Sequence, residues 1–108
     1  MTVKTAHLRI ARATDNLEKV VSFYKEGLGF ETVASFEEHD GFDGVMLGHK
    51  GAPYHLEFTS CVGHKAGRAP NEDDLLVFYL PELGEWMAAV KQMEEAGYED
   101  VKSFNPYW

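Results

Sequence analysis

The chain has 108 residues, of which 44% are hydrophobic, 13% are aromatic and 26% are charged. This length fits one compact domain, and this balance of apolar and charged residues excludes an intrinsically disordered chain. The net charge of −8 argues against nucleic acid and anionic membranes as partners, because both present negatively charged phosphates.

The first 60 residues are predicted to form a strand, a helix and three further strands. Residues 6–11 alternate between polar and apolar, which is typical of a half-buried strand. A helix begins near Asp15, because Glu18 follows three positions later as in a capping box, and Gly29 ends it. Residues 39–44 contain two Asp-Gly pairs and predict a turn-rich loop. The other strands are predicted at residues 31–36, 45–48 and 54–60.

The remaining residues predict a linker followed by a strand, a helix and a strand. Residues 61–74 contain glycines, a proline and an acidic patch with little periodicity, as linkers do. Residues 75–80 are apolar on both faces and predict a central strand. Residues 84–97 predict a helix that ends at Gly97, and residues 98–104 predict the last strand.

The chain contains an internal repeat. LGFETVASF at residues 28–36 matches AGYEDVKSF at residues 96–104, and the same offset of 68 residues superposes the predicted strands and helices on either side. The repeat predicts a first module at residues 1–60, the linker, and an incomplete second module at residues 75–108, together forming one domain. The second module lacks the counterparts of two strands. An unpaired edge of this kind favours association, so we expect a partner chain or a continuation of the chain to cover it.

Polar side chains recur on one face of two predicted strands. Alternation places His55 and Glu57 on the same face of the fourth strand, and His7 and Arg9 on the same face of the first. If the two strands share a sheet, imidazole nitrogens and a carboxylate converge, and these ligands suit Zn²⁺, Ni²⁺, Mn²⁺ or Fe²⁺. Two readings compete with a metal site: a polar face that meets only water, and a cross-strand ion pair between Arg9 and Glu57.

Two stretches carry a family resemblance. HLRIARATDNLEKVVSFYKEGLGFE at residues 7–31 and YHLEF at residues 54–58 resemble the glyoxalase, bleomycin-resistance and extradiol dioxygenase group, the vicinal oxygen chelate superfamily. The features that match are the initial His7, the helix led by Asp15 and the Leu-Gly-Phe-Glu stretch after it. The resemblance implies an α+β fold in which paired βαβββ modules form a curled mixed sheet, shaped as a cup, here with the second module truncated after its βαβ part.

The resemblance also implies a site. Metal-dependent members of the superfamily take one ligand from the first and one from the fourth strand of each module, which carries over to His7 and Glu57. The second-module ligand falls on Leu75, which cannot bind a metal, and its acidic counterpart has no residue in this chain. The implied cofactor is therefore a divalent metal in a site that this chain does not complete, with the alternative that no metal binds.

Two functions follow from the resemblance. The first is a metal-dependent lyase or a related dioxygenase-like enzyme, in which Glu57 is the catalytic residue and the substrate is small and carries vicinal oxygens. The second, which the acidic charge and Leu75 favour, is a homodimeric small-molecule-binding protein similar to the bleomycin-resistance proteins, which bind cationic drugs beside aromatic side chains. The candidate ligand-binding residues are Arg9, His55, Tyr79, Tyr107 and Trp108.

The sequence also bears on location. Cys61 is the single cysteine, which excludes an internal disulfide and fits a reducing compartment. The longest apolar stretch, residues 75–80, is too short to cross a bilayer. We therefore expect a cytoplasmic protein with no membrane partner.

Overall fold

The computed structural model describes residues 3–68 and 71–108 and has the predicted α+β class. A 3-10 turn (Val3–Thr5) precedes the first strand, and a π-helical segment, η2 (Phe23–Gly27), extends the first helix. The strands and helices in chain order are β1 (Leu8–Ala13), α1 (Leu17–Ser22), β2 (Glu31–His39), β3 (Phe42–Gly48), β4 (Tyr54–Cys61) and α2 (Leu83–Glu95).

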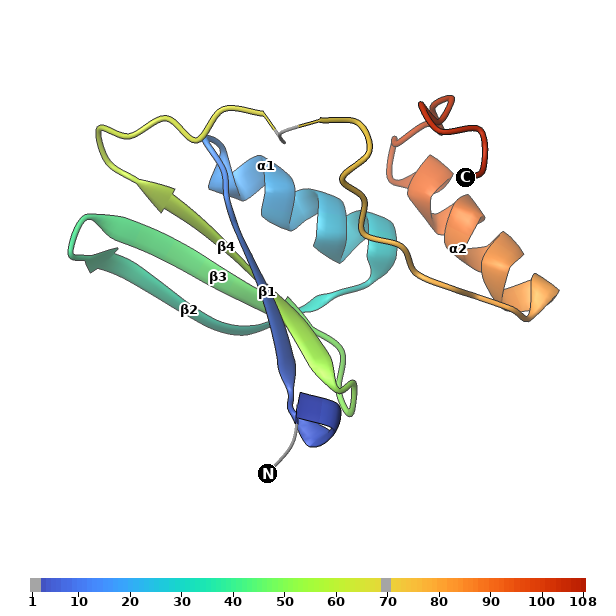
Figure 1. Ribbon diagram of the computed structural model, residues 1–108, viewed down its shortest axis with the longest axis horizontal. Helices are drawn as coiled ribbons and strands as arrows, with labels where there is room; N and C mark the ends of the chain where they lie inside the picture. The colour runs from blue at the N-terminus through green and yellow to red at the C-terminus, as the bar shows by residue number, and fades with distance from the viewer. Residues whose placement is uncertain (1–2, 69–70) are drawn as a thin grey trace.

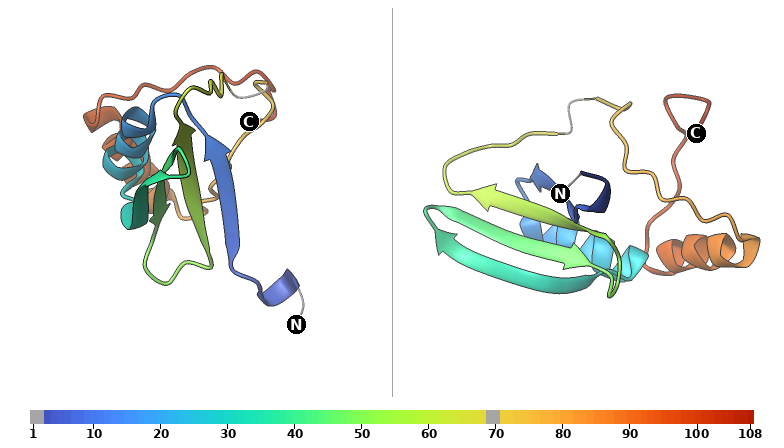
Figure 2. Two further views of the ribbon diagram at one scale, coloured as in Figure 1. Left: turned by 90° about the vertical axis from the view of Figure 1, so that its left-hand side faces the viewer. Right: turned by 60° about the horizontal axis from the view of Figure 1, so that its bottom comes forward.

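The strands form one curled mixed sheet in the order β1-β4-β3-β2. β1 runs parallel to β4, and the other two pairings are antiparallel. α1 and η2 cover one face of this sheet, and the opposite face is left open (Figures 1 and 2). The parallel pairing places the first and fourth strands side by side, as the predicted polar face requires.

The core lies between the sheet and α1. Its fully enclosed side chains are Leu47 and Leu56, which are 0% and 1% exposed, joined by the buried rings of Phe30 and Phe58. Leu56 and Phe58 are two residues apart in β4, so the pleat of the strand points both toward the helix. The same pleat points His55 and Glu57 to the open face, which confirms the predicted alternation.

The connection between β2 and β3 is shorter than predicted. Residues 39–44 were expected to form a loop, but β2 continues to His39 and β3 begins at Phe42. Only Asp40 and Gly41 lie between them, with φ of 53° and 86°. Positive φ at both central residues is the type I′ turn that Asp-Gly favours, because its twist matches that of the flanking strands. The hairpin therefore closes in two residues.

Asp15 anchors the linker and does not cap α1. The capping residue is Asn16, whose side chain accepts from the amide of Lys19. The carboxylate of Asp15 accepts hydrogen bonds from the amides of Ala66 at 2.7 Å and Gly67 at 2.9 Å. These two bonds hold the pKa of Asp15 below its usual value. The predicted capping box is wrong because the linker offers two donors to a carboxylate at this position.

The second module has its predicted helix but not its predicted strands. α2 packs against η2, where Gly27 lies so close to Met93 that a Cβ atom would come within 2.7 Å of the sulfur. Residues 75–80 and 98–104 are not in strands. Among the described residues the sheet contains β1, β4, β3 and β2 alone, so neither segment completes a hydrogen-bonded ladder with a strand. Residues 75–78 instead lie along the apolar side chains of Leu8, Ile10 and Tyr54.

Many apolar side chains of the second module remain exposed. They include Leu75, Val77, Phe78, Leu83, Trp86, Met87, Val101 and Phe104. Within residues 3–68 and 71–108, no helix is both long and apolar enough to cross a membrane. The exposed side chains form an apolar surface around α2 and its flanking segments.

Candidate functional site on the polar face of the sheet

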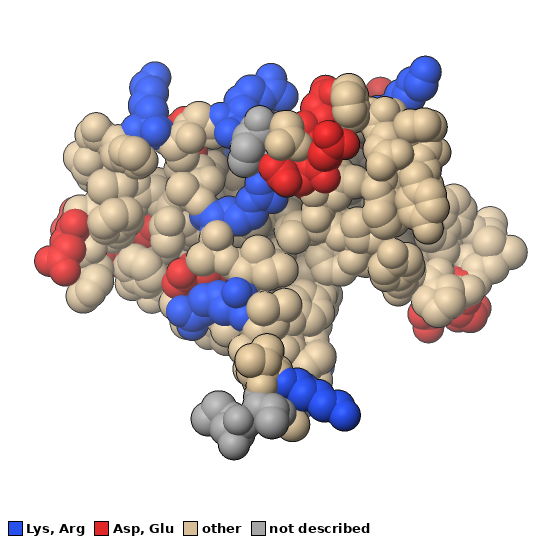
Figure 3. Space-filling view, viewed as in Figure 1, with Lys and Arg blue, Asp and Glu red and all other residues tan. Residues whose placement is uncertain are grey.

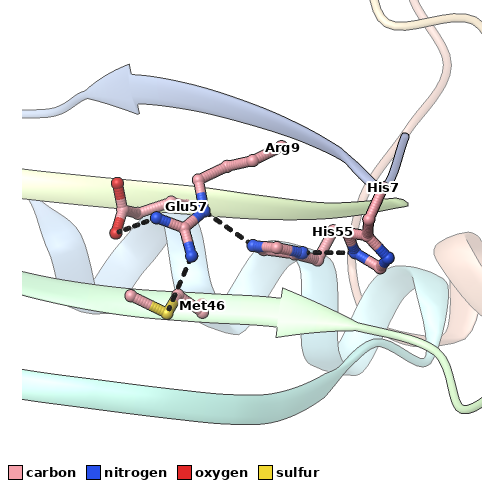
Figure 4. A network of polar contacts seen from close by, with 5 residues as sticks. All are labelled: His7, Arg9, Met46, His55 and Glu57. Atoms are coloured by element: carbon pink, nitrogen blue, oxygen red, sulfur yellow. Dashed lines mark hydrogen bonds and ion pairs between the residues drawn. The ribbon is translucent and has the colours of Figure 1, made fainter. Parts of the chain in front are cut away.

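The predicted convergence of polar side chains occurs on the open face of β1 and β4. In the parallel register Arg9 lies beside His55, and Ala11 lies beside Glu57. His7 precedes β1 by one residue and reaches His55 from the end of the strand (Figure 4). We name His7, Arg9, His55 and Glu57 the polar cluster. Two residues at the start of the chain and two in β4, nearly 50 positions later, thus form one group.

Arg9 lies at the centre of the polar cluster, between His55 and Glu57 (Figure 4). Its Nη1 atom is 3.7 Å from Oε2 of Glu57, so the cross-strand ion pair expected as one alternative is present. Arg9 is 48% exposed and Glu57 is 15% exposed, so the guanidinium faces solvent while the carboxylate is largely covered. Such a half-exposed pair contributes little to stability, and its effect is to orient the guanidinium.

Met46 is a member of the site that sequence reasoning missed. Its sulfur is 3.9 Å from Nη2 of Arg9, and it lies opposite Glu57 in the register of β3 and β4. Strand alternation would place Met46 on the face shared by Gly44 and Gly48, both without side chains. That pattern was the available signal, but β3 was predicted too short for it to be recognised.

The hydrogen bonds determine the tautomers of both histidines. Nε of Arg9 can only donate, and it lies 2.7 Å from Nε2 of His55, so Nε2 of His55 is the acceptor. Neutral His55 therefore carries its proton on Nδ1, which donates to Nε2 of His7 at 2.6 Å. His7 then carries its own proton on Nδ1. The chain of bonds runs from Arg9 through His55 to His7, and both ring nitrogens of His55 are engaged.

The surroundings of His55 favour its neutral form. Partial burial lowers the pKa of His55, and the positive charge of Arg9 and the ring of His7 lower it further, while Glu57 opposes them. Protonation would also place a hydrogen on Nε2, against the Nε–H of Arg9. In this neutral form His55 accepts from Nε of Arg9 and thereby orients the guanidinium.

The polar cluster does not fit a metal site as its side chains stand. Both nitrogens of His55 and the Nε2 atom of His7 are hydrogen-bonded, and Glu57 faces a guanidinium. No group of three His, Cys, Asp or Glu side chains in the described part of the chain could hold an ion. A cation at Arg9 also repels a second cation beside Glu57. The metal roles of His7 and Glu57 therefore remain predictions that the polar cluster does not support.

The candidate aromatic residues lie apart from the polar cluster. Tyr79 and Tyr107 are 78% and 81% exposed, and the ring of Tyr107 contacts that of Trp108 at 5.0 Å. The C-terminus lies beside α2, away from the open face of β1 and β4 (Figure 1). The structure therefore brings Arg9 and His55 together but not the three aromatic side chains.

Comparison with known proteins identifies relatives. The model of the YycE-like N-terminal domain matches residues 8–59, and that of the YycE-like C-terminal domain matches residues 73–108. The uncharacterized protein YycE of Bacillus subtilis (strain 168) is 44% identical over 105 residues, which cover 97% of this chain and 76% of that protein.

A solved structure agrees with the fold. The 2.0 Å crystal structure of YycE from Bacillus subtilis superposes with a TM-score of 0.84 and 44% identity, covering 96% of this chain and 76% of that one. That protein has unknown function and is provisionally assigned as a glyoxalase/fosfomycin resistance protein. The chain therefore belongs to the YycE-like family, within the vicinal oxygen chelate superfamily of glyoxalases, bleomycin-resistance proteins and extradiol dioxygenases.

Proposed function

We propose that the chain is a small-molecule-binding protein whose ligand contacts Arg9 on the open face of the sheet. The observation that supports this is the position of the guanidinium, which is oriented by His55 and Glu57 yet remains half exposed. An oriented cation loses less conformational freedom when a ligand binds than a free side chain would.

Arg9 has hydrogen-bonding capacity to spare. A guanidinium has five N–H donors, and the Nε–H is used by His55. The 3.7 Å separation from Glu57 is an ion pair but exceeds hydrogen-bond length, and the sulfur of Met46 is a weak acceptor. The two Nη groups can therefore donate in parallel to paired oxygens, as in a carboxylate or phosphonate. Distant acidic side chains have little effect at this point, because charges beyond about 8 Å are screened at physiological salt, so the charges that act on the ligand are those of Arg9 and of Glu57 beside it.

The metal-dependent lyase remains the second candidate. What favours it is that His7, His55 and Glu57, all metal-binding side chain types, share one face. It would require Arg9 to move away from Glu57 and further ligands to come from outside the polar cluster. The binding function needs neither change, so it is the reading that the geometry supports better.

An NMR titration tests the binding function. Fosfomycin, a phosphonate, and bleomycin, a cationic glycopeptide, are added separately to labelled protein. We expect fosfomycin to shift the amides of β1 and β4 and the side-chain Nε–H of Arg9. Arg9→Gln should weaken this binding about tenfold or more, the loss expected for a charged hydrogen bond. Lys50→Gln, which removes the same charge from an exposed turn, should leave the affinity unchanged.

Four outcomes would contradict the proposal. Shifts that map away from the polar cluster, or an affinity insensitive to Arg9→Gln, would show that Arg9 is not the contact. If millimolar fosfomycin causes no shift, the proposal that a ligand with paired anionic oxygens binds Arg9 is wrong. Stoichiometric binding of Zn²⁺ or Ni²⁺ that Glu57→Gln abolishes would replace the binding function by the metal-dependent one.

We also propose that the division into modules 1–60 and 75–108 holds and that the protein forms a homodimer. The exposed apolar side chains around α2 support association, because water exposure of so large an apolar group is unfavourable. Sedimentation equilibrium should give twice the chain mass, and a monomer at all concentrations up to about 0.1 mM would contradict a dimer of standard interface size.

A further inference from the structure

A hollow lies beside α1, on the face of the sheet opposite the polar cluster. It has a volume of about 690 Å³ and is bounded by the end of β1, by α1, by the linker at residues 66–68 and by Tyr98. Ligand pockets commonly span about 300–1,000 Å³, so the size suits a small organic molecule. None of the residues of the polar cluster lines it.

The charged residues that line this hollow are all basic. They are Arg12, Lys19 and Arg68, and no Asp or Glu lines it, although the chain has 18 acidic and 10 basic residues. In the space-filling view, Lys and Arg side chains lie over the linker and the end of β1, and an acidic group adjoins them (Figure 3). The nearby Asp15 carboxylate is engaged by the amides of Ala66 and Gly67. The charged side chains of the lining are therefore positive, while the ionised Asp15 carboxylate lies behind the linker amides that hold it.

Arg12 is placed unusually for an arginine. It pairs with Phe58 in the register of β1 and β4, so its side chain shares the apolar face with that ring and is half buried. Arg9, three residues earlier, has both a carboxylate and an imidazole as partners. Among the described residues, the guanidinium of Arg12 makes no hydrogen bond or ion pair. A partly desolvated cation without a partner costs free energy, which an anionic ligand would offset.

The floor of the hollow is aromatic. The rings of Tyr24 and Phe58 stack at 5.0 Å with an interplanar angle of 28°, and the rings of Phe23 and Tyr98 meet edge to face at 4.8 Å. Burial raises the pKa of Tyr24, with Arg12 opposing the shift, so the phenol stays neutral at physiological pH. Neutral rings beside cations suit a ligand with a flat apolar part and a negative group.

We propose that this hollow is a second binding site, for a small aromatic anion whose negative group contacts Arg12 and Arg68 and whose ring lies against Tyr24 and Tyr98. The site goes beyond the proposed function, since it lies on the opposite face of the sheet and uses a different arginine. A large polyanion does not fit the inference, because the net charge of −8 repels it while only three basic side chains attract it.

The test is an NMR titration with 2-naphthoate. We expect it to shift the amides of α1, the end of β1 and residues 66–68. Arg12→Gln should weaken this binding about tenfold or more. Arg68→Gln should weaken it in the same direction, and because Arg68 is exposed on the linker its replacement does not disturb the core. Lys50→Gln is the charge-matched control and should leave the affinity within about twofold, since a remote exposed charge is screened.

Further probes separate charge from ring. Acetate, which lacks the ring, and 2-naphthalenemethanol, which lacks the charge, should each bind at least about tenfold more weakly than 2-naphthoate. Equal binding of the neutral alcohol, shifts confined to α2 and residues 75–80, or no shift up to millimolar 2-naphthoate would each overturn the proposal. Arg9→Gln distinguishes the two sites: it should weaken fosfomycin binding at the polar cluster about tenfold or more and leave the 2-naphthoate shifts around Arg12 in place.

Discussion

Replacing Leu56 by alanine is expected to lower the free energy of unfolding by about 2–5 kcal/mol. Leu56 is 1% exposed and lies at the centre of the sheet, between β1 and β3, against the side chains of α1. Its truncation removes apolar contacts and leaves a cavity that paired strands on both sides cannot close. Urea unfolding followed by circular dichroism measures the change as a lower midpoint with an unchanged slope.

Leu83→Ala is the matched control for this substitution. Leu83 begins α2 and is 68% exposed, so the same chemical change there should alter the free energy of unfolding by less than about 0.5 kcal/mol. Equal losses at the two positions would contradict the described core. They would place the apolar surface of the second module inside the cooperatively folded unit instead.

Replacing Gly44 by alanine is expected to destabilise the protein by about 1–3 kcal/mol. Gly44 pairs with Phe36 across β2 and β3, and a Cβ atom on Gly44 would overlap the ring of Phe36. The ring lies directly over the glycine, so the substitution must push the ring off a strand surface that it covers. Thermal unfolding should show the loss as a lower Tm.

A double-mutant cycle checks the cause of that loss. In a Phe36→Ala background the obstructing ring is gone, so Gly44→Ala should cost clearly less than it does in the parent chain. An undiminished cost would mean that the backbone of Gly44, and not the ring above it, makes glycine necessary. The two outcomes differ by an interaction energy of about 0.5–3 kcal/mol, which is measurable.

Much of the first module could be predicted because its signals are local. Alternation in residues 54–60 correctly assigned Leu56 to the core and Glu57 to the open face. The helical spacing after residue 15 correctly predicted α1, although Asn16 and not Asp15 caps it. The prediction of strands at residues 75–80 and 98–104 was wrong, because strand formation there depends on tertiary pairing that a local pattern does not show. An apolar extended segment becomes a strand only if it pairs with a neighbouring strand, and neither segment is paired in the sheet of β1 to β4.

The sequence by itself determined the α+β class, the family and the membership of the polar face, because side-chain alternation and motif residues are properties of short stretches. Only the tertiary structure decided how that face is arranged. The parallel pairing of β1 with β4 places Arg9 between His55 and Glu57. The pleat of β1 turns Arg12 to the opposite face, where the same register places it beside Phe58. Alternation puts the two arginines of β1 on different faces, and the partners that each one meets depend on pairing with residues almost 50 positions away in the chain.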